Sequence, residues 1–234
     1  MSHCLRILLS GFFVLLLPDL YAQQSLPDST AAAMAKTATL GSYTSYMGIQ
    51  APLFNGKAYQ AHLPLQGTPY FLDDSLEYGT ILYDGVLYRE IPMFYDLIYG
   101  QPVVLNGWGG MLAPVPERIS QFTIAGHDFI RDKDDFYDQL VTGKVRLLAH
   151  RAKVVTENIV QQELLRDVSE RDHYFLVKDG VYHQVGNLNS LLSILKDKKK
   201  DILLYIGQQK IRRRKDAERA MIAAVQFYNQ SLPH

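Results

Sequence analysis

The sequence predicts an α+β protein, in which an antiparallel β-sheet built from hairpins is followed by a small C-terminal helical segment. Two observations lead to this fold class. The middle of the chain contains five short turn signals between runs of apolar and β-branched residues, as successive hairpins require. After Gly186 the apolar residues change to helical spacing. Strands first and helices last are typical of α+β proteins.

Residues 1–22 have the pattern of a secretory signal peptide. An apolar run over 7–17 follows a basic residue, and Leu20-Tyr21-Ala22 ends with a small residue. A membrane anchor is the alternative, but a spanning helix needs about 20 apolar residues. We therefore expect cleavage after Ala22, a flexible N-terminal segment over 23–50, and no transmembrane segment in the mature chain. The protein is then exported, and it is periplasmic, outer-membrane-associated or extracellular.

Residues 51–186 are expected to form the antiparallel β region. The turns are expected at Asn55-Gly56, Asp84-Gly85, Ala125-Gly126, Thr142-Gly143 and Asp179-Gly180. Both central residues of a type I′ hairpin turn need a positive φ, which glycine adopts without strain. We therefore expect positive φ at Gly85 and Gly180.

The positions of the turns also predict strand register. A two-residue loop at Thr142-Gly143 places Leu140 opposite Val145 and Phe136 opposite Ala149. That side of the hairpin is apolar apart from Asp138, as a half-buried pair requires. The Asp84-Gly85 hairpin is apolar on both sides, which indicates a central pair of strands.

Residues 187–234 are expected to form helices that pack on the sheet. Four leucines from Leu188 to Leu195 have helical spacing, and Asp197 is placed to cap a second helix that carries Ile202, Tyr205 and Ile206. Asp216 is placed to cap a third. One stripe of that helix contains Ala217, Ala220, Met221, Ala224 and Tyr228.

Charge is unevenly distributed although the net charge of the chain is zero. Residues 188–234 contain ten Lys or Arg residues and four Asp or Glu residues. A basic surface of this kind binds an anionic partner, docks on the acidic part of the chain, or is simply solvated. Nucleic acid is not expected outside the cytoplasm, so anionic lipid or polysaccharide is the preferred anion. The candidate partner surface consists of Lys198, Lys199, Lys200, Arg212, Arg213, Arg214 and the only tryptophan, Trp108.

Trp108 lies in the glycine-rich segment 107–110, which lacks the pattern of a phosphate-binding loop. It either anchors its loop by packing or stacks on a ring of a partner.

Strong catalytic motifs are absent from the sequence. Cys4 is the only cysteine and precedes the expected cleavage site, which excludes thiol nucleophiles, iron–sulfur clusters and Cys-ligated zinc in the mature chain. Neither Gly-x-Ser-x-Gly nor His-Glu-x-x-His occurs. His173 and His183 flank the Asp179-Gly180 turn, but the turn places Leu176 opposite His183 and puts the two histidines on opposite faces. We assign no catalytic, cofactor-binding or metal-binding residue, and we expect no cofactor.

Several polar groups leave weaker alternatives. Residues 132–135 read Asp-Lys-Asp-Asp, but the positions that an EF-hand fills with a ligand and a glycine hold Phe136 and Tyr137. A solvated acidic turn is preferred there over a surface calcium site. His127-Asp128 is interpreted as a pair of turn residues. The remaining carboxylates of interest, which could serve glycoside hydrolysis if they converge, are Asp73, Asp74, Glu77 and Asp96.

Most of residues 50–230 resembles a group of exported proteins of Gram-negative bacteria that has no known activity. The resemblance lies in the segments 53–59, 67–71, 79–88, 91–97, 136–137, 143–147, 174–180, 195–200 and 227–229. It implies an exported location and the extent of the domain, and it implies no catalytic residue.

Two classes of function follow. The preferred one is a non-catalytic envelope protein that binds an unknown envelope component. The alternative is a small exported hydrolase that uses carboxylates or a metal. A pocket with convergent carboxylates or histidines would favour the hydrolase, whereas a filled core and exposed aromatic surface would favour the binding protein.

Overall fold

A computed structural model describes residues 51–232, in which strands form most of residues 51–185 and helices follow Gly186. The fold class predicted from the sequence is therefore confirmed. The expected signal peptide (1–22) and N-terminal segment (23–50) lie outside the described residues. The strands are β1 (Lys57–Ala58), β2 (Glu77–Tyr83), β3 (Val86–Asp96), β4 (Gln101–Leu105), β5 (Met111–Ala113), β6 (Ile119–Ile124), β7 (His127–Asp132), β8 (Asp135–Val141), β9 (Val145–His150), β10 (Lys153–Val160), β11 (Glu163–Glu170), β12 (His173–Lys178) and β13 (Val181–Val185). The helices are α2 (Leu188–Ile194), α3 (Lys199–Gln208) and α4 (Ala217–Gln230), with short 3-10 turns at Pro52–Phe54, Pro116–Arg118 and Lys196–Lys198.

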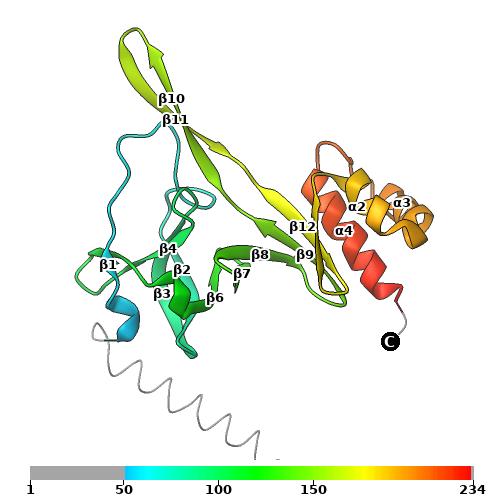
Figure 1. Cartoon of the computed structure of the whole chain (residues 1–234), viewed down its shortest axis with the longest axis horizontal. Coiled ribbons are helices and arrows are strands. Elements are labelled where there is room, and N and C mark those ends of the chain that lie inside the picture. Colours follow the sequence, from blue (N-terminus) through cyan, green and yellow to red (C-terminus); the bar gives the residue numbers. More distant parts are fainter. Residues whose placement is uncertain (1–50, 233–234) are drawn as a thin grey trace, which may run out of the picture. The chain divides into compact units, whose positions relative to one another are not determined.

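Two antiparallel sheets account for the strands of residues 51–232. One has eleven strands in the order β1-β5-β4-β3-β2-β6-β7-β8-β9-β12-β13, and the other is the β10–β11 pair, a long ribbon in Figure 1. Three of the predicted hairpins have the expected two-residue loops, because residues on either side of each turn pair directly: Tyr83 with Val86, Ile124 with His127, and Lys178 with Val181. Gly85 and Gly180 have φ of 75° and 77°, as predicted.

The turn predicted at Asn55-Gly56 is wrong. Asn55 ends a 3-10 turn, and β1 pairs with the distant β5 instead of folding back on its neighbour. A Cβ on Gly56 would lie 2.3 Å from the carbonyl oxygen of Ala113. The glycine is therefore needed for the close approach of another strand and not for a hairpin turn.

The register predicted across Thr142-Gly143 is also wrong. Asp138 pairs with Ala149 in place of Phe136, the ladder is irregular between Gln139 and Val141, and β9 does not begin until Val145. The reason is a tertiary contact from α4. The Oδ1 atom of Asn229 accepts from the Val145 N–H (3.0 Å), and its Nδ2 atom donates to the Val145 carbonyl (2.7 Å). These two bonds replace the strand-to-strand pairing that Val145 would make next to a two-residue loop.

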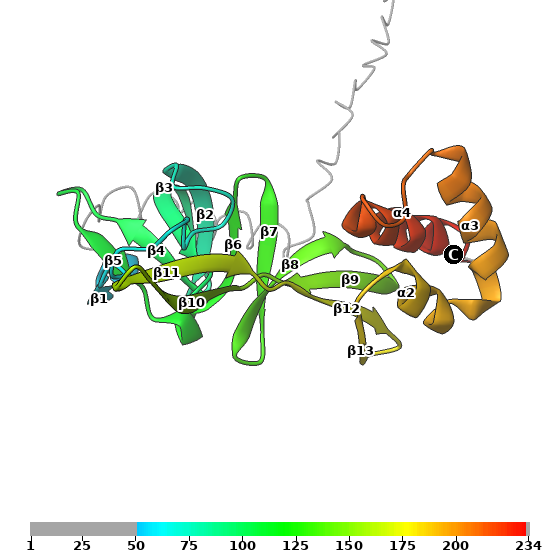
Figure 2. The ribbon, with the colours of Figure 1, turned by 90° about the horizontal axis from the view of Figure 1, so that it is seen from above.

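Buried side chains form two cores that share no member. The aromatic core lies in the strands before β9, and its rings include Tyr83, Tyr88, Tyr95, Phe122, Phe129 and Phe136. The helix-covered core joins β8, β9, β12 and β13 to the three helices, through residues that include Val141, Leu147, Leu176, Leu191, Ile206 and Met221. Figure 2 shows the helices beside these strands. The helical segment therefore packs on these strands.

The helix stripes are confirmed, but the caps differ from the expectation. Asp197 caps no helix, because α3 begins at Lys199 and the Asp197 carboxylate accepts from the Tyr228 hydroxyl (3.1 Å). Asp216 precedes α4 without capping it through its side chain. Asn187, which the sequence reading missed, makes a capping box with Ser190 at the start of α2.

Candidate functional site

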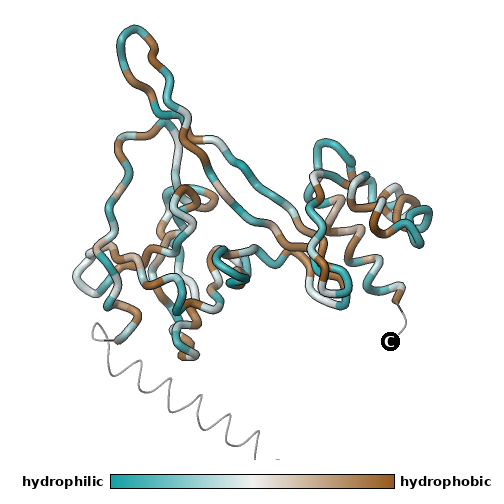
Figure 3. Tube along the Cα trace, viewed as in Figure 1, coloured by the Kyte–Doolittle hydropathy of each residue, from teal (hydrophilic) through white to brown (hydrophobic). Residues whose placement is uncertain are grey.

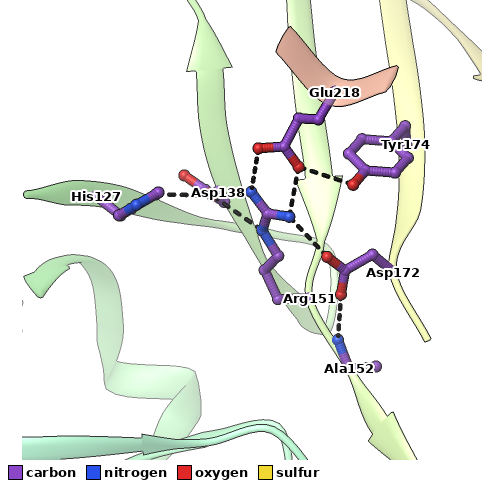
Figure 4. Close-up of polar contacts among 7 residues, drawn as sticks. All are labelled: His127, Asp138, Arg151, Ala152, Asp172, Tyr174 and Glu218. Carbon is purple, nitrogen blue, oxygen red and sulfur yellow. Dashed lines mark hydrogen bonds and ion pairs between the residues drawn. The ribbon is translucent and has the colours of Figure 1, made fainter. Parts of the chain in front are cut away.

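The densest group of charges in residues 51–232 surrounds Arg151, which follows β9. Its guanidinium group contacts carboxylates from three other segments: Asp138 in β8, Asp172 before β12 and Glu218 in α4 (Figure 4). We call these four residues the Arg151 network. Asp138 and Arg151 are buried, with 1% and 8% of their surface exposed. Buried charges of this kind persist only when they are paired.

All five N–H groups of Arg151 are used within the network. The Nε and Nη2 atoms donate to Asp138 Oδ2 (3.0 and 2.8 Å), and Nη1 donates to Asp172 Oδ2 (2.6 Å). The remaining bonds of Nη1 and Nη2 go to the two carboxylate oxygens of Glu218 (2.6 and 3.1 Å). Because a guanidinium group has five N–H donors, Arg151 has none left for a ligand.

Electrostatics holds the network in its charged form. Burial lowers the pKa of Arg151, but the hydrogen bonds from Arg151 to Glu218 and Asp172 outweigh it and raise that pKa. Burial also opposes ionisation of Glu218, yet the bonds that it accepts from Arg151 and from the Tyr174 hydroxyl (2.7 Å) lower its pKa. The carboxylate of Glu218 is therefore ionised wherever the fold is intact at neutral pH.

The Arg151 network lies at the boundary between the two cores. Asp138 lies in β8 between Phe136, a member of the aromatic core, and Val141, a member of the helix-covered core. Strand β8 thus passes from one core to the other, and the Arg151 network lies where it does so. The network is a polar junction between two apolar cores.

His127 extends the junction toward a cavity. Its Nδ1 atom lies 3.0 Å from Asp138 Oδ2, and since a carboxylate that binds Arg151 only accepts, Nδ1 carries the proton. No hydrogen bond within residues 51–232 occupies Nε2. The arrangement is an Asp–His pair with the second imidazole nitrogen free, which is the geometry of an oriented general base.

The cavity beside the network has a volume of about 330 Å³. Its lining residues are Phe71, Leu72, Leu97, His127, Arg151, Glu170, Asp172 and Glu218. This lining contains no serine, threonine or cysteine that could act as a nucleophile. The described residues 51–232 also contain no group of three or more His, Cys, Asp or Glu side chains arranged to hold a metal ion.

A second buried carboxylate, Asp96, is fully enclosed elsewhere in the aromatic region. It accepts hydrogen bonds from the Tyr59 hydroxyl (2.7 Å) and from the backbone N–H groups of Ile98 and Tyr99, and it pairs with Nε2 of His62 (2.7 Å). Burial and the bond to Asp96 raise the pKa of Tyr59. No hydrogen bond or shared cavity within residues 51–232 joins Asp96 to the other carboxylates considered from the sequence, Asp73, Asp74 and Glu77.

The residues of the predicted partner surface are exposed, apart from the half-buried Lys198. Trp108 is 81% exposed, so it does not anchor its loop by packing. Instead, Oδ1 of Asn106 accepts from the backbone N–H groups of Trp108 (3.0 Å) and Gly110 (2.8 Å) and orders the loop. Arg212 lies 3.6 Å from Asp216, while no ion pair involves Arg213 or Arg214 among the described residues.

Few features of the sequence indicated the Arg151 network. The one signal was Asp138, an acidic residue on the otherwise apolar side of a strand. Arg151, Asp172 and Glu218 lie far apart in the chain and match no motif, and His127 was interpreted as a turn residue. The register prediction for the other histidines is confirmed, because Leu176 lies opposite His183.

Protein-family models, curated proteins and solved structures were compared with the chain, and none of them matches it.

Proposed function

We propose that the protein is an exported, non-catalytic envelope protein that binds a partner through the β10–β11 ribbon. The observation that carries this proposal is the end of the ribbon. Ile159 and Leu164 lie opposite each other and are 79% and 47% exposed, and the adjacent Val160 is 50% exposed. In Figure 3, hydrophobic (brown) stretches lie near the end of the ribbon.

The ribbon is anchored at its base and uncovered at its end. Lys153, at the start of β10, is buried and donates from Nζ to the carbonyls of Thr68 (3.1 Å) and Tyr70 (2.6 Å). Gln66 pairs with β11 through bonds to Arg166 and Val168. Residues 156–164 have no comparable cover and are exposed. Single exposed apolar side chains are ordinary, whereas a group at the end of a ribbon indicates an interaction site.

The Arg151 network supports a non-catalytic role. Three of its members are carboxylates that bind Arg151, and no serine, threonine or cysteine lines the adjacent cavity. The exported location rests on the apolar run over 7–17 and on the resemblance described above. Among residues 51–232, every helix is too short or too polar to cross a membrane.

Site-specific photo-crosslinking in the native host tests the proposal. A photoreactive residue at Ile159 or Leu164 should give an adduct of one common mass in the envelope fraction. The matched control is Leu204 in α3, an apolar residue that is 65% exposed. Equal adducts from all three positions, or none from the ribbon, would refute a specific contact there.

The location is tested separately by intact mass. Protein purified from the envelope should begin at or near Gln23. Retention of residues 1–22 in exported protein would contradict the expected signal peptide.

A carboxylate hydrolase is the second candidate, and the His127–Asp138 pair beside the cavity is the observation that favours it. His127→Gln should then abolish hydrolysis of glycoside or ester substrates, and unchanged turnover would eliminate His127 as a base. In such a reaction His127 would act as the base that activates water.

A further inference from the structure

The cavity beside the Arg151 network is independent of the ribbon, and its chemistry indicates what it binds. At about 330 Å³ it is large enough for a small organic molecule or a long side chain. Three lining residues are acidic and two, Arg151 and His127, are basic. Asp138, directly behind Arg151, adds a further negative charge.

An anion would find no donor from Arg151 in this cavity. All five N–H groups of Arg151 are bonded to carboxylates. The nearby Lys153 is also occupied, since its Nζ atom donates to two backbone carbonyls. The positive charges are therefore committed to the protein, while the acidic lining residues outnumber the single arginine.

Glu170 is the lining carboxylate that Arg151 does not bind. Its side chain makes no ion pair or hydrogen bond with any residue in 51–232, and the charge of Lys153, opposite it in the β10–β11 register, acts on it through space alone. Asp172 and Glu218, by contrast, each bind Arg151. A cationic ligand at Glu170 would gain a counter-charge without breaking the Arg151 network.

The rest of the lining is apolar, which separates an organic cation from a metal ion. Phe71, Leu72 and Leu97 supply this part. Leu72 is 58% exposed and has φ of 63°, a left-handed conformation that is unfavourable for a branched side chain. The described residues offer no set of three metal-ligating side chains. A ligand with an alkyl chain and a cationic end fits this lining. Its chain would contact the apolar residues, and its charge would lie at Glu170.

We propose that this cavity binds an alkylammonium or guanidinium group, with Glu170 as its counter-charge and Phe71, Leu72 and Leu97 against its carbon chain. Such a group occurs on free amines and on the lysine and arginine side chains of peptides. The two sources share the same chemistry and are distinguished by the probes below.

Nuclear magnetic resonance titration of the mature chain tests the proposal. The probes are pentylamine, pentanol and pentanoate, which share one chain length, and the tripeptides Gly-Lys-Gly, Gly-Arg-Gly and Gly-Glu-Gly. Pentylamine should shift the amide signals of residues 71, 97 and 170 saturably, and pentanol and pentanoate should not. Tighter binding of the basic tripeptides than of pentylamine would identify a peptide side chain as the source, and the reverse order would identify a free amine.

Two variants of β11 supply the matched comparison. Glu170→Gln should weaken binding of the preferred cation about tenfold or more, because it removes a charged partner. Glu163→Gln, a glutamate at the other end of the same strand, should leave it unchanged. Both variants should melt like the parent, since neither carboxylate has a bonded partner among the described residues. Saturable binding of pentanoate, equal effects of the two variants, or no saturation by any cation would overturn the proposal.

Discussion

The aromatic core and the helix-covered core both bury apolar side chains, but they are built from different residue types. The aromatic core is closed by the sheet and its loops, and its rings interlock, as in the pairs Phe122–Phe129 (4.8 Å between centroids) and Tyr95–Phe129 (4.9 Å). The helix-covered core contains mainly Leu, Ile, Val and Ala, because helices α2 and α4 approach the sheet closely through small and branched side chains. Large rings contribute much buried area for each residue, and small residues allow close packing of a helix.

This difference in packing between the two cores accounts for the charged group that lies between them. Where β8 leaves one packing geometry for the other, the Arg151 network links β8, the segments beside β9 and β12, and helix α4. A buried ion network offsets much of its Coulombic gain with lost hydration, so it adds little to net stability. We expect its strict hydrogen-bond geometry to determine instead how the two cores are connected. The following changes to the protein test this connection between the cores.

Removing Asp138 should have the largest effect. Asp138→Ala leaves Arg151 buried with two of its five N–H bonds broken, which should lower the free energy of unfolding by about 3–5 kcal/mol. Thermal or urea unfolding of the mature protein measures it. Asp134→Ala is the control, because the Asp134 side chain is fully exposed and its loss should cost less than about 0.5 kcal/mol. Equal losses in the two variants would contradict a junction that depends on Asp138.

Truncating the helix-covered core tests whether the cores unfold together. Leu191 is completely buried in that core, and Leu191→Ala should cost about 2–5 kcal/mol through the cavity that it leaves. We expect one cooperative transition, because β8 and the Arg151 network connect the cores. Hydrogen exchange should then accelerate equally at the amides of Leu176 and Ile81. Acceleration at Leu176 alone would show that the aromatic core is an independent unit.

Equivalent hairpin turns in the two regions should lose the same free energy of unfolding when their glycine is replaced. Gly180 belongs to the β12–β13 hairpin and Gly85 to the β2–β3 hairpin, and no atom lies within 4 Å of an added Cβ at either position. Gly180→Val and Gly85→Val should therefore each cost about 1–2 kcal/mol through backbone strain alone. Chemical denaturation compares them. No loss at Gly180 would argue against the left-handed turn, and unequal losses would show that one hairpin is less constrained.

Low pH should weaken the contact between Glu218 of α4 and Arg151, and this effect should be the smallest of those described here. The pKa of Glu218 is lower in the folded protein than in the unfolded chain, so its ionisation stabilises the fold above the unfolded pKa. That stabilisation is lost as the pH falls through the folded pKa. Unfolding midpoints measured from neutral pH to below pH 4 should thus decline less steeply in Glu218→Gln than in the parent. Parallel curves would mean that other carboxylates carry the acid sensitivity.

Local signals in the sequence determined the fold class and most hairpins. Asp-Gly and Ala-Gly turns, alternating residues in the strands and helical spacing after Gly186 were sufficient, because each depends on the conformational preferences of a few neighbouring residues. The buried stripe of α4 and the register that separates His173 from His183 followed from the same local rules.

Only the tertiary structure decided the β8–β9 register, the partner of β1 and the site. Asn229 reorganises the start of β9 from the far end of the chain, and Gly56 accommodates the distant Ala113 and not a turn. Arg151, Asp138, Asp172 and Glu218 meet because two cores join there. These contacts depend on residues that are distant in the chain, and local conformational preferences do not specify which distant residues meet.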